Sequence, residues 1–157
     1  MASKGNLTLK SCNGKEFIVE EKVAVMSTTI KNMVDVDDSF AQGVIPIIGV
    51  DGKILAKLIE YCKEHAEADE DEEVKSEEYL KKFDEKFVDE LNLNDLYDLL
   101  KASNYLEITK LLNLLCQKVA SMIKGKKPEE IRRIFNIKND FTPEEEEEIN
   151  RQNPWAF

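Results

Sequence analysis

Apolar and polar residues alternate twice near the start of the chain, which is the pattern of half-buried β-strands. The stretch LTLKSCNGKEFIV has an apolar residue at every second position on both sides of Asn13-Gly14. An Asn-Gly pair between two such runs favours a tight type I′ turn. The pattern therefore predicts that residues 7–11 and 16–20 pair as a β-hairpin.

The next segments change to helical spacing, with one short strand between them. The segment EEKVAVMSTTIKNMVDV has apolar residues three or four positions apart, which predicts one or two short helices. Residues 44–48, VIPII, are short, β-branched and interrupted by Pro46, as in an edge strand. The segment DGKILAKLIEYCKEH predicts a longer helix with one apolar face. Residues 1–66 are thus expected to form a mixed N-terminal unit of strands and helices.

Residues 67–78, EADEDEEVKSEE, carry a run of charge without periodicity. Such a run is typical of a solvated loop, and we predict an acidic flexible loop here. A calcium site in an acidic ion-binding protein is the alternative. Calcium loops need alternating oxygen ligands and a glycine at the turn, and this run contains no glycine.

All remaining segments have helical spacing and clear end signals. Gly125 is expected to stop one helix, and Pro128 suits the first position of the next. Thr142 and Glu145 have the spacing of a capping box, and Pro154 is expected to end the last helix. The predicted helices cover EEYLKKFDEKFVDEL, LNDLYDLLKASNYL, EITKLLNLLCQKVASMIKG, KPEEIRRIF and TPEEEEEINRQN.

The charge of the chain narrows the classes of partner. The net charge is −10, from 22 basic and 32 acidic residues, so we expect neither nucleic acid nor an anionic membrane surface as a partner. The start has no apolar core like that of a signal peptide.

Cys12, Cys62 and Cys116 are odd in number, far apart and set among apolar neighbours. They are predicted to be buried free thiols in a reducing compartment, the nucleus and cytoplasm, and we expect no metal or cofactor.

No residue pattern points to catalysis. The single histidine, His65, is predicted at the surface near a helix end, and no plausible nucleophile lies close to it in the sequence. Glycine-rich phosphate loops are missing, and the carboxylates lie in hydrated runs rather than as isolated pairs. We therefore predict that the protein is not an enzyme.

The tail places the only tryptophan, Trp155, beyond a run of glutamates. Burying one large aromatic ring hides about 150–250 Å², but ordering each residue costs about 1–2 kcal/mol. A short helix is also marginal in water on its own. Trp155 and Phe157 could fold back on the chain's own helices. We favour the alternative, in which they complete an apolar surface with a partner.

The C-terminal stretch MIKGKKPEEIRRIFNIKNDFTPEEEEEINRQNPWAF resembles the S-phase kinase-associated adaptors of SCF (Skp–cullin–F-box) ubiquitin ligases, above all the plant branch. STTIKNM, KILAKLIEYCKEH and SNYLEI resemble the same family in the same order. The resemblance implies an α+β chain: a BTB/POZ fold, made of a small sheet with flanking helices, and then a C-terminal helical F-box-binding extension. The implied parts are residues 1–66, the loop 67–78, further POZ helices at 79–124, and F-box-binding helices and tail at 125–157.

The resemblance also implies the partners and their surfaces. The adaptor has no catalytic residue and connects a cullin scaffold to F-box proteins, which select substrates for ubiquitination. Asn104 and Tyr105 match the family's cullin-facing element. A larger apolar set, several of whose members are expected to be internal, matches the F-box surface: Leu112, Leu115, Val119, Ile123, Ile131, Ile134, Phe135, Ile137, Phe141 and Trp155.

Two segments depart from the family pattern. Phe83 opens F-D-E-K-F where the family has a tryptophan, so aromatic packing is expected to survive. Lys101, Ala102 and Ser103 stand where the family favours an apolar residue and then alanines. A POZ scaffold outside ubiquitination, elongin-like or self-associating, is the alternative function.

Overall fold

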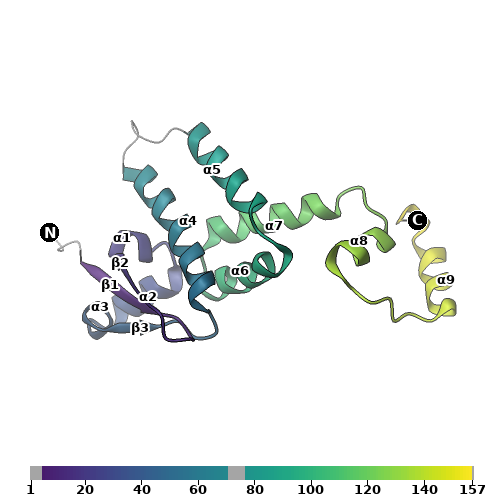
Figure 1. Cartoon of the computed structure of the whole chain (residues 1–157). Coiled ribbons are helices and arrows are strands. Elements are labelled where there is room, and N and C mark those ends of the chain that lie inside the picture. The colour runs from purple at the N-terminus through teal and green to yellow at the C-terminus, as the bar shows by residue number, and fades with distance from the viewer. Residues whose placement is uncertain (1–4, 71–76, 157) are drawn as a thin grey trace. The chain divides into compact units, whose positions relative to one another are not determined.

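A three-stranded sheet combines a hairpin with a third strand from further along the chain. The strands are β1 (Asn6–Lys10), β2 (Glu16–Glu20) and β3 (Val44–Pro46), in the order β2-β1-β3 (Figure 1). β1 pairs with β2 antiparallel and with β3 parallel. The register places Leu9 opposite Ile45, and both are buried. The predicted hairpin strands and the edge position of β3 are confirmed.

The turn between β1 and β2 differs from the predicted type I′ turn. Gly14 has φ +86°, and its N–H donates to the Ser11 carbonyl at 3.0 Å, but Asn13 keeps a negative φ. The strands are connected by the five residues 11–15, with the glycine in the left-handed region. Asn13 has a tertiary role instead, because its Oδ1 accepts from the Gly52 N–H at 2.9 Å.

Helices follow the hairpin and cover one face of the sheet. The two predicted short helices are α1 (Glu21–Ala24) and α2 (Thr28–Val36), and an unpredicted turn of helix, α3 (Ser39–Gln42), precedes β3. α4 (Gly52–Glu70) presents its predicted apolar face to the core, where Leu55, Leu58 and Tyr61 are fully buried.

The predicted loop at 67–78 is wrong at both ends. α4 continues to Glu70 because Ala66 and Ala68 remain buried, so packing supports helix where charge suggested a loop. α5 (Glu77–Asp89) has already begun by residue 77. Residues 71–76, which make up half of the alternative calcium site, lie outside the described residues, and so does Phe157 of the tail.

The remaining predicted helices are all present. The structure, a computed structural model, describes residues 5–70 and 77–156 and forms two compact units, Met1–Cys116 and Gln117–Phe157. In the first unit, α6 (Leu93–Tyr105) and the start of α7 (Thr109–Ile123) complete the core with Leu99, Leu111 and Leu115. The division of the helical part at residue 125 stays a prediction.

The second unit contains the end of α7, α8 (Pro128–Phe135), α9 (Pro143–Gln152) and a short 3₁₀ turn at Pro154–Ala156. Its end signals behave as predicted. Gly125 has φ +72°, and Pro128 is the first residue of α8. The capping box is formed by Thr142 and Glu145, with reciprocal bonds of 3.2 Å.

His65 is buried, which corrects the prediction of a surface histidine. It is only 7% exposed, and its Nε2 lies 2.7 Å from Asp84 Oδ1 on α5. Its ring stacks on Tyr61 with centroids 4.3 Å apart, and Phe83 and Phe87 pack nearby, with their ring centroids 5.9 Å apart. α5 lies alongside α4 (Figure 1), and this aromatic cluster joins the two helices.

The cysteines are free, but only Cys62 is buried, while Cys12 and Cys116 are exposed. The prediction of three buried thiols is therefore wrong for two of them, because Cys12 lies in the loop between β1 and β2 and Cys116 lies on an exposed side of α7. Burial raises the pKa of the Cys62 thiol to about 12 and also raises the pKa of Tyr61.

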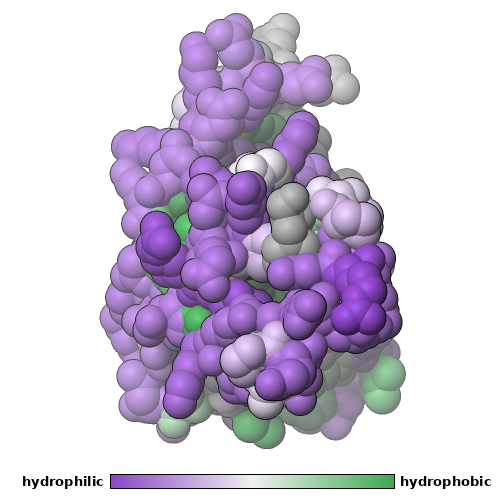
Figure 2. All heavy atoms as spheres, turned by 90° about the vertical axis from the view of Figure 1, so that its right-hand side faces the viewer, coloured by the Kyte–Doolittle hydropathy of each residue, from purple (hydrophilic) through white to green (hydrophobic). Residues whose placement is uncertain are grey.

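One face of the molecule is mostly polar (Figure 2). Figure 2 shows a face dominated by hydrophilic residues, with hydrophobic residues confined to small areas. Within residues 5–70 and 77–156, no helix combines the length and apolar character needed to span a bilayer. In the same ranges, no three His, Cys, Asp or Glu side chains gather into a group that could hold a metal ion.

Candidate protein-binding surfaces

The end of α6 carries Asn104 and Tyr105 on the surface of the first unit. Both side chains are exposed, Tyr105 to 46%, whereas Leu106 directly after them is buried. α6 is fixed at its other end by Asn92, whose side chain accepts from the Asp95 N–H at 2.8 Å. The helix thus presents the two residues with implied cullin contacts together on one exposed surface.

The start of α2 holds this end of α6 in place. Ser27 Oγ donates to the Leu106 carbonyl at 2.5 Å, and it also accepts from the Ile30 N–H at 3.2 Å as the N-cap of α2. Thr29 Oγ1 donates to the Tyr105 carbonyl at 3.1 Å. Sequence reasoning missed these positioning residues, although a serine directly before an apolar-periodic run is an N-cap signal.

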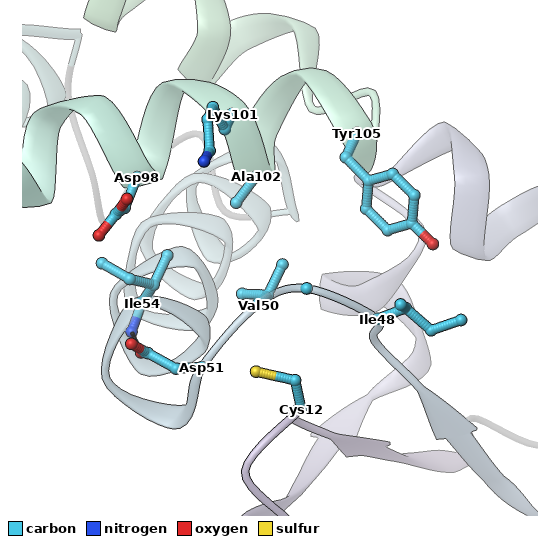
Figure 3. Close-up of a pocket in the computed structure, with 10 residues that line it drawn as sticks. Cys12, Ile48, Val50, Asp51, Ile54, Asp98, Lys101, Ala102 and Tyr105 are labelled. Atoms are coloured by element: carbon cyan, nitrogen blue, oxygen red, sulfur yellow. Dashed lines mark hydrogen bonds between the residues drawn. The ribbon is translucent and has the colours of Figure 1, made fainter.

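An open pocket of about 400 Å³ lies beside Tyr105 (Figure 3). Its walls come from the end of the hairpin, the segment between β3 and α4, and α6. Asp51 and Asp98 lie toward one end of the pocket, and Ile48 and Tyr105 lie toward the other, as Figure 3 shows. The pocket was not anticipated, because its walls are far apart in sequence.

Of the implied F-box residues on α7, the two in the first unit differ in exposure. Leu115 is fully buried and packs in the core, so it cannot contact a partner without rearrangement of the helices. Leu112 is half-buried. In the second unit, Val119 is half-buried and Ile123 is exposed. The set therefore contains internal residues, as expected.

α8 and the segments after it carry the other implied F-box residues. Ile131, Ile134 and Phe135 share one face of α8 and are half-buried. The remaining three are exposed, Ile137 to 56%, Phe141 to 47% and Trp155 to 85%. The structure brings all of these residues into one unit, in which no residue from 117 to 156 is fully buried.

A polar network connects α8, the segment after it and α9. Arg132 Nη1 lies 3.2 Å from Glu129 and 3.7 Å from Glu146, and its guanidinium is 6.0 Å from the Phe141 ring centroid. Asn139 Nδ2 donates to Glu146 Oε1 at 2.6 Å. Polar contacts, rather than a buried apolar core, therefore orient Phe141.

These observations define a class of protein, the protein-binding adaptor. Its first unit is a small sheet with flanking helices, and its second unit leaves apolar side chains in solvent. Residues 6–67 match the description "Skp1 family, tetramerisation domain", and residues 109–156 match "Skp1 family, dimerisation domain". The predicted α+β architecture with a POZ unit is thereby confirmed.

Similar proteins cover the whole chain. SKP1-like protein 11 of Arabidopsis thaliana is 54% identical over 157 residues, which are 100% of this chain and 99% of that protein. SKP1-like protein 20 of Oryza sativa subsp. japonica is 49% identical over 171 residues, with 99% and 96% of the two chains covered. The chain belongs to the Skp1 family. It is an adaptor of SCF ubiquitin ligases. Proteins of the Skp1 family bind F-box proteins and cullins, and they are generally non-catalytic. A scaffold role outside ubiquitination is not favoured.

Proposed function

We propose that this chain connects a cullin to F-box proteins through two different surfaces and catalyses no reaction itself. The observation that carries the proposal is the exposure of the C-terminal unit, where Trp155 is 85% exposed and no described residue is fully buried. Burying such a ring removes about 150–250 Å² from water. A partner that covers this unit therefore gains the apolar contacts that the unit does not make internally.

The proposed F-box surface consists of the α8 face and the apolar residues that follow it. Phe135 and Trp155 are its proposed anchors, because large aromatic side chains supply most of the binding energy at protein interfaces. Ile137 and Phe141 extend the surface between α8 and α9. Leu115 supports α7 from the core and is not proposed to make contact.

The proposed cullin surface is centred on Asn104 and Tyr105. Tyr105 offers an exposed ring with a polar tip, and Asn104 offers an amide that can donate and accept hydrogen bonds. Their backbone is held by α2, so the contact surface is preorganised before the partner arrives.

Hydrogen exchange of the full chain tests the F-box half of the proposal. Amides of α8 and α9 are expected to exchange faster in the isolated chain than those of α6, and to become protected when a purified F-box domain is added. Exchange that stays unchanged with a panel of F-box domains contradicts the proposal.

Capture of a cullin N-terminal domain tests the other half. The double variant Asn104→Lys with Tyr105→Lys should abolish capture, because it places two new charges in the proposed contact. Asn113→Lys, an exposed change on α7, serves as the control and should leave capture intact. Equal capture by all three proteins argues against this surface.

The proposed location is the nucleus and the cytoplasm, which is compatible with three free cysteines. A fluorescent fusion should show both compartments. Calcium calorimetry of the full chain should give no heat of binding, whereas a saturable signal would support the ion-binding alternative at residues 67–78.

A further inference from the structure

One face of α6 carries an exposed row of side chains that ends at Tyr105. Tyr97, Lys101 and Tyr105 follow one another at intervals of four residues, so they lie along the same side of the helix. All three are exposed, and Tyr97 is 60% exposed. The opposite side of the helix packs in the core through Leu96 and Leu99. We call these three residues the α6 row.

Lys101 has a defined position in the α6 row. Its Nζ lies 5.0 Å from the centroid of the Tyr97 ring, a distance at which a cation is attracted to the face of an aromatic ring. Within the described residues, Lys101 forms no ion pair. Its charge is therefore held in place by an uncharged ring, and a carboxylate from outside could still pair with it.

The pocket beside the α6 row determines what can approach Lys101. Figure 3 shows Lys101 extending from α6 over the pocket, with Val50 opposite it. Asp98 lies one turn earlier on α6, and Asp51 lies at the start of α4, where its Oδ1 accepts from the Ile54 N–H at 2.9 Å. The centre of the pocket thus combines the cation of Lys101 with apolar walls. The acidic groups lie at the end of the pocket that is farther from Tyr105.

A partner that covers Tyr105 also covers the ammonium group of Lys101, which is one helical turn away. Burying an ammonium group without a partner costs several kcal/mol, whereas a facing carboxylate compensates for most of that cost. An apolar contact at this position is therefore penalised, and a basic contact is penalised further.

We propose that Lys101 selects among cullins: the preferred cullin helix places a carboxylate on Lys101 Nζ and apolar side chains on Tyr97 and Tyr105. This inference rests on the proposed function, because it deepens the assignment of Asn104 and Tyr105 to the cullin surface. The charge of Lys101, which no carboxylate of the described residues pairs with, and its position one helical turn from Tyr105 support this occupant. Lys101 is then a specificity-determining residue at the interface.

The experiment measures binding of the full chain to a panel of cullin N-terminal domains at two salt concentrations. Lys101→Met retains the length of the side chain and removes its charge, and Lys101→Glu reverses the charge. For the preferred cullin, Lys101→Glu should weaken binding on the order of 30-fold or more. Lys101→Met should weaken it less and reduce its dependence on salt. The matched control is Lys81→Met, an exposed lysine on α5 that does not line the pocket.

A charge exchange identifies the facing group. Each acidic residue on the docking helices of the preferred cullin is replaced by lysine in turn. One of these replacements should weaken binding to the wild type and restore binding to Lys101→Glu, because the pair is re-formed with reversed signs. If Lys101 only stabilised the fold, reversing a charge on the cullin would not restore binding.

The outcomes separate the two proposals. If the wild type binds cullins and the Asn104–Tyr105 double variant does not, but both Lys101 variants bind within twofold of wild type, the role of Lys101 is overturned and the proposed function stands. Loss of binding without rescue by any reversed carboxylate also overturns the role of Lys101. A wild type that binds no cullin overturns both.

Discussion

Replacing Ser27 by alanine should destabilise the first unit far more than a single hydroxyl suggests. Ser27 is only 2% exposed, and its Oγ both caps α2 and donates to the Leu106 carbonyl. Ser27→Ala therefore removes one of the hydrogen bonds that join the start of α2 to the end of α6, between two residues 79 positions apart in the sequence. The variant leaves the shape of the backbone unchanged, so the loss of stability reports on these bonds.

The magnitude follows from two contributions. Loss of a helix N-cap costs about 0.5–2 kcal/mol. A buried carbonyl that loses its donor costs about 1–3 kcal/mol, and among the described residues the one other donor to the Leu106 carbonyl is the Thr29 N–H at 3.4 Å, a weak bond. The expected total is about 2–4 kcal/mol, a large share of the roughly 5–15 kcal/mol that stabilises a typical domain.

Urea denaturation followed by circular dichroism measures this loss. With a slope of about 2 kcal/mol per molar urea, the midpoint should fall by roughly 1–2 M. Ser121→Ala is the control, because Ser121 Oγ donates to the Lys118 carbonyl at an exposed position within one helix, and it should change stability by less than about 0.5 kcal/mol. A Ser27→Ala midpoint no lower than that of the control would refute the reasoning.

Three further predictions concern other residues. Trp155→Ala should leave the melting temperature of the isolated chain unchanged, because the ring is 85% exposed, but should weaken F-box binding by about 2 kcal/mol or more in calorimetry; equal affinities would contradict this. Cys62 should resist iodoacetamide in the native chain while the two exposed cysteines react. Its pKa is raised from 9.0 to about 12, so its contribution to stability is complete below about pH 9 and is lost as the pH rises toward 12. A Cys62→Ala chain should lose less stability than wild type between these pH values, and parallel losses would count against it. Asp84→Ala should cost about 1–3 kcal/mol in urea, because the buried His65 loses its partner; an unchanged midpoint would show that the pair contributes nothing.

The local features of the fold could be predicted from the sequence because their causes are local. Thr142 and Glu145 form a capping box within four consecutive residues. Pro128 begins α8, because the proline ring fixes φ near the helical value. Pro154 follows the end of α9 as expected. The resemblance likewise depended on contiguous stretches of sequence, above all the long C-terminal one, and it led to the family and to the general role of the chain.

Burial and partner choice were decided by tertiary contacts. His65 was predicted at the surface because its neighbours in sequence are charged, but Asp84 and Tyr61 enclose it once α5 lies against α4. Asn13 was assigned to a type I′ turn, and its side chain instead bonds to Gly52.

The same division holds for the candidate surfaces. The family resemblance predicted contact roles for Asn104, Tyr105 and the apolar residues of the last helices, because motifs and helical spacing can be recognised along the chain; these roles stay predictions. Only the tertiary structure showed that Leu115 is buried and Trp155 is exposed. The pocket that Lys101 lines also forms only in the tertiary structure. The physical reason is that exposure and pocket shape depend on which distant segments pack together, and spacing along a single segment carries no information about its neighbours in space.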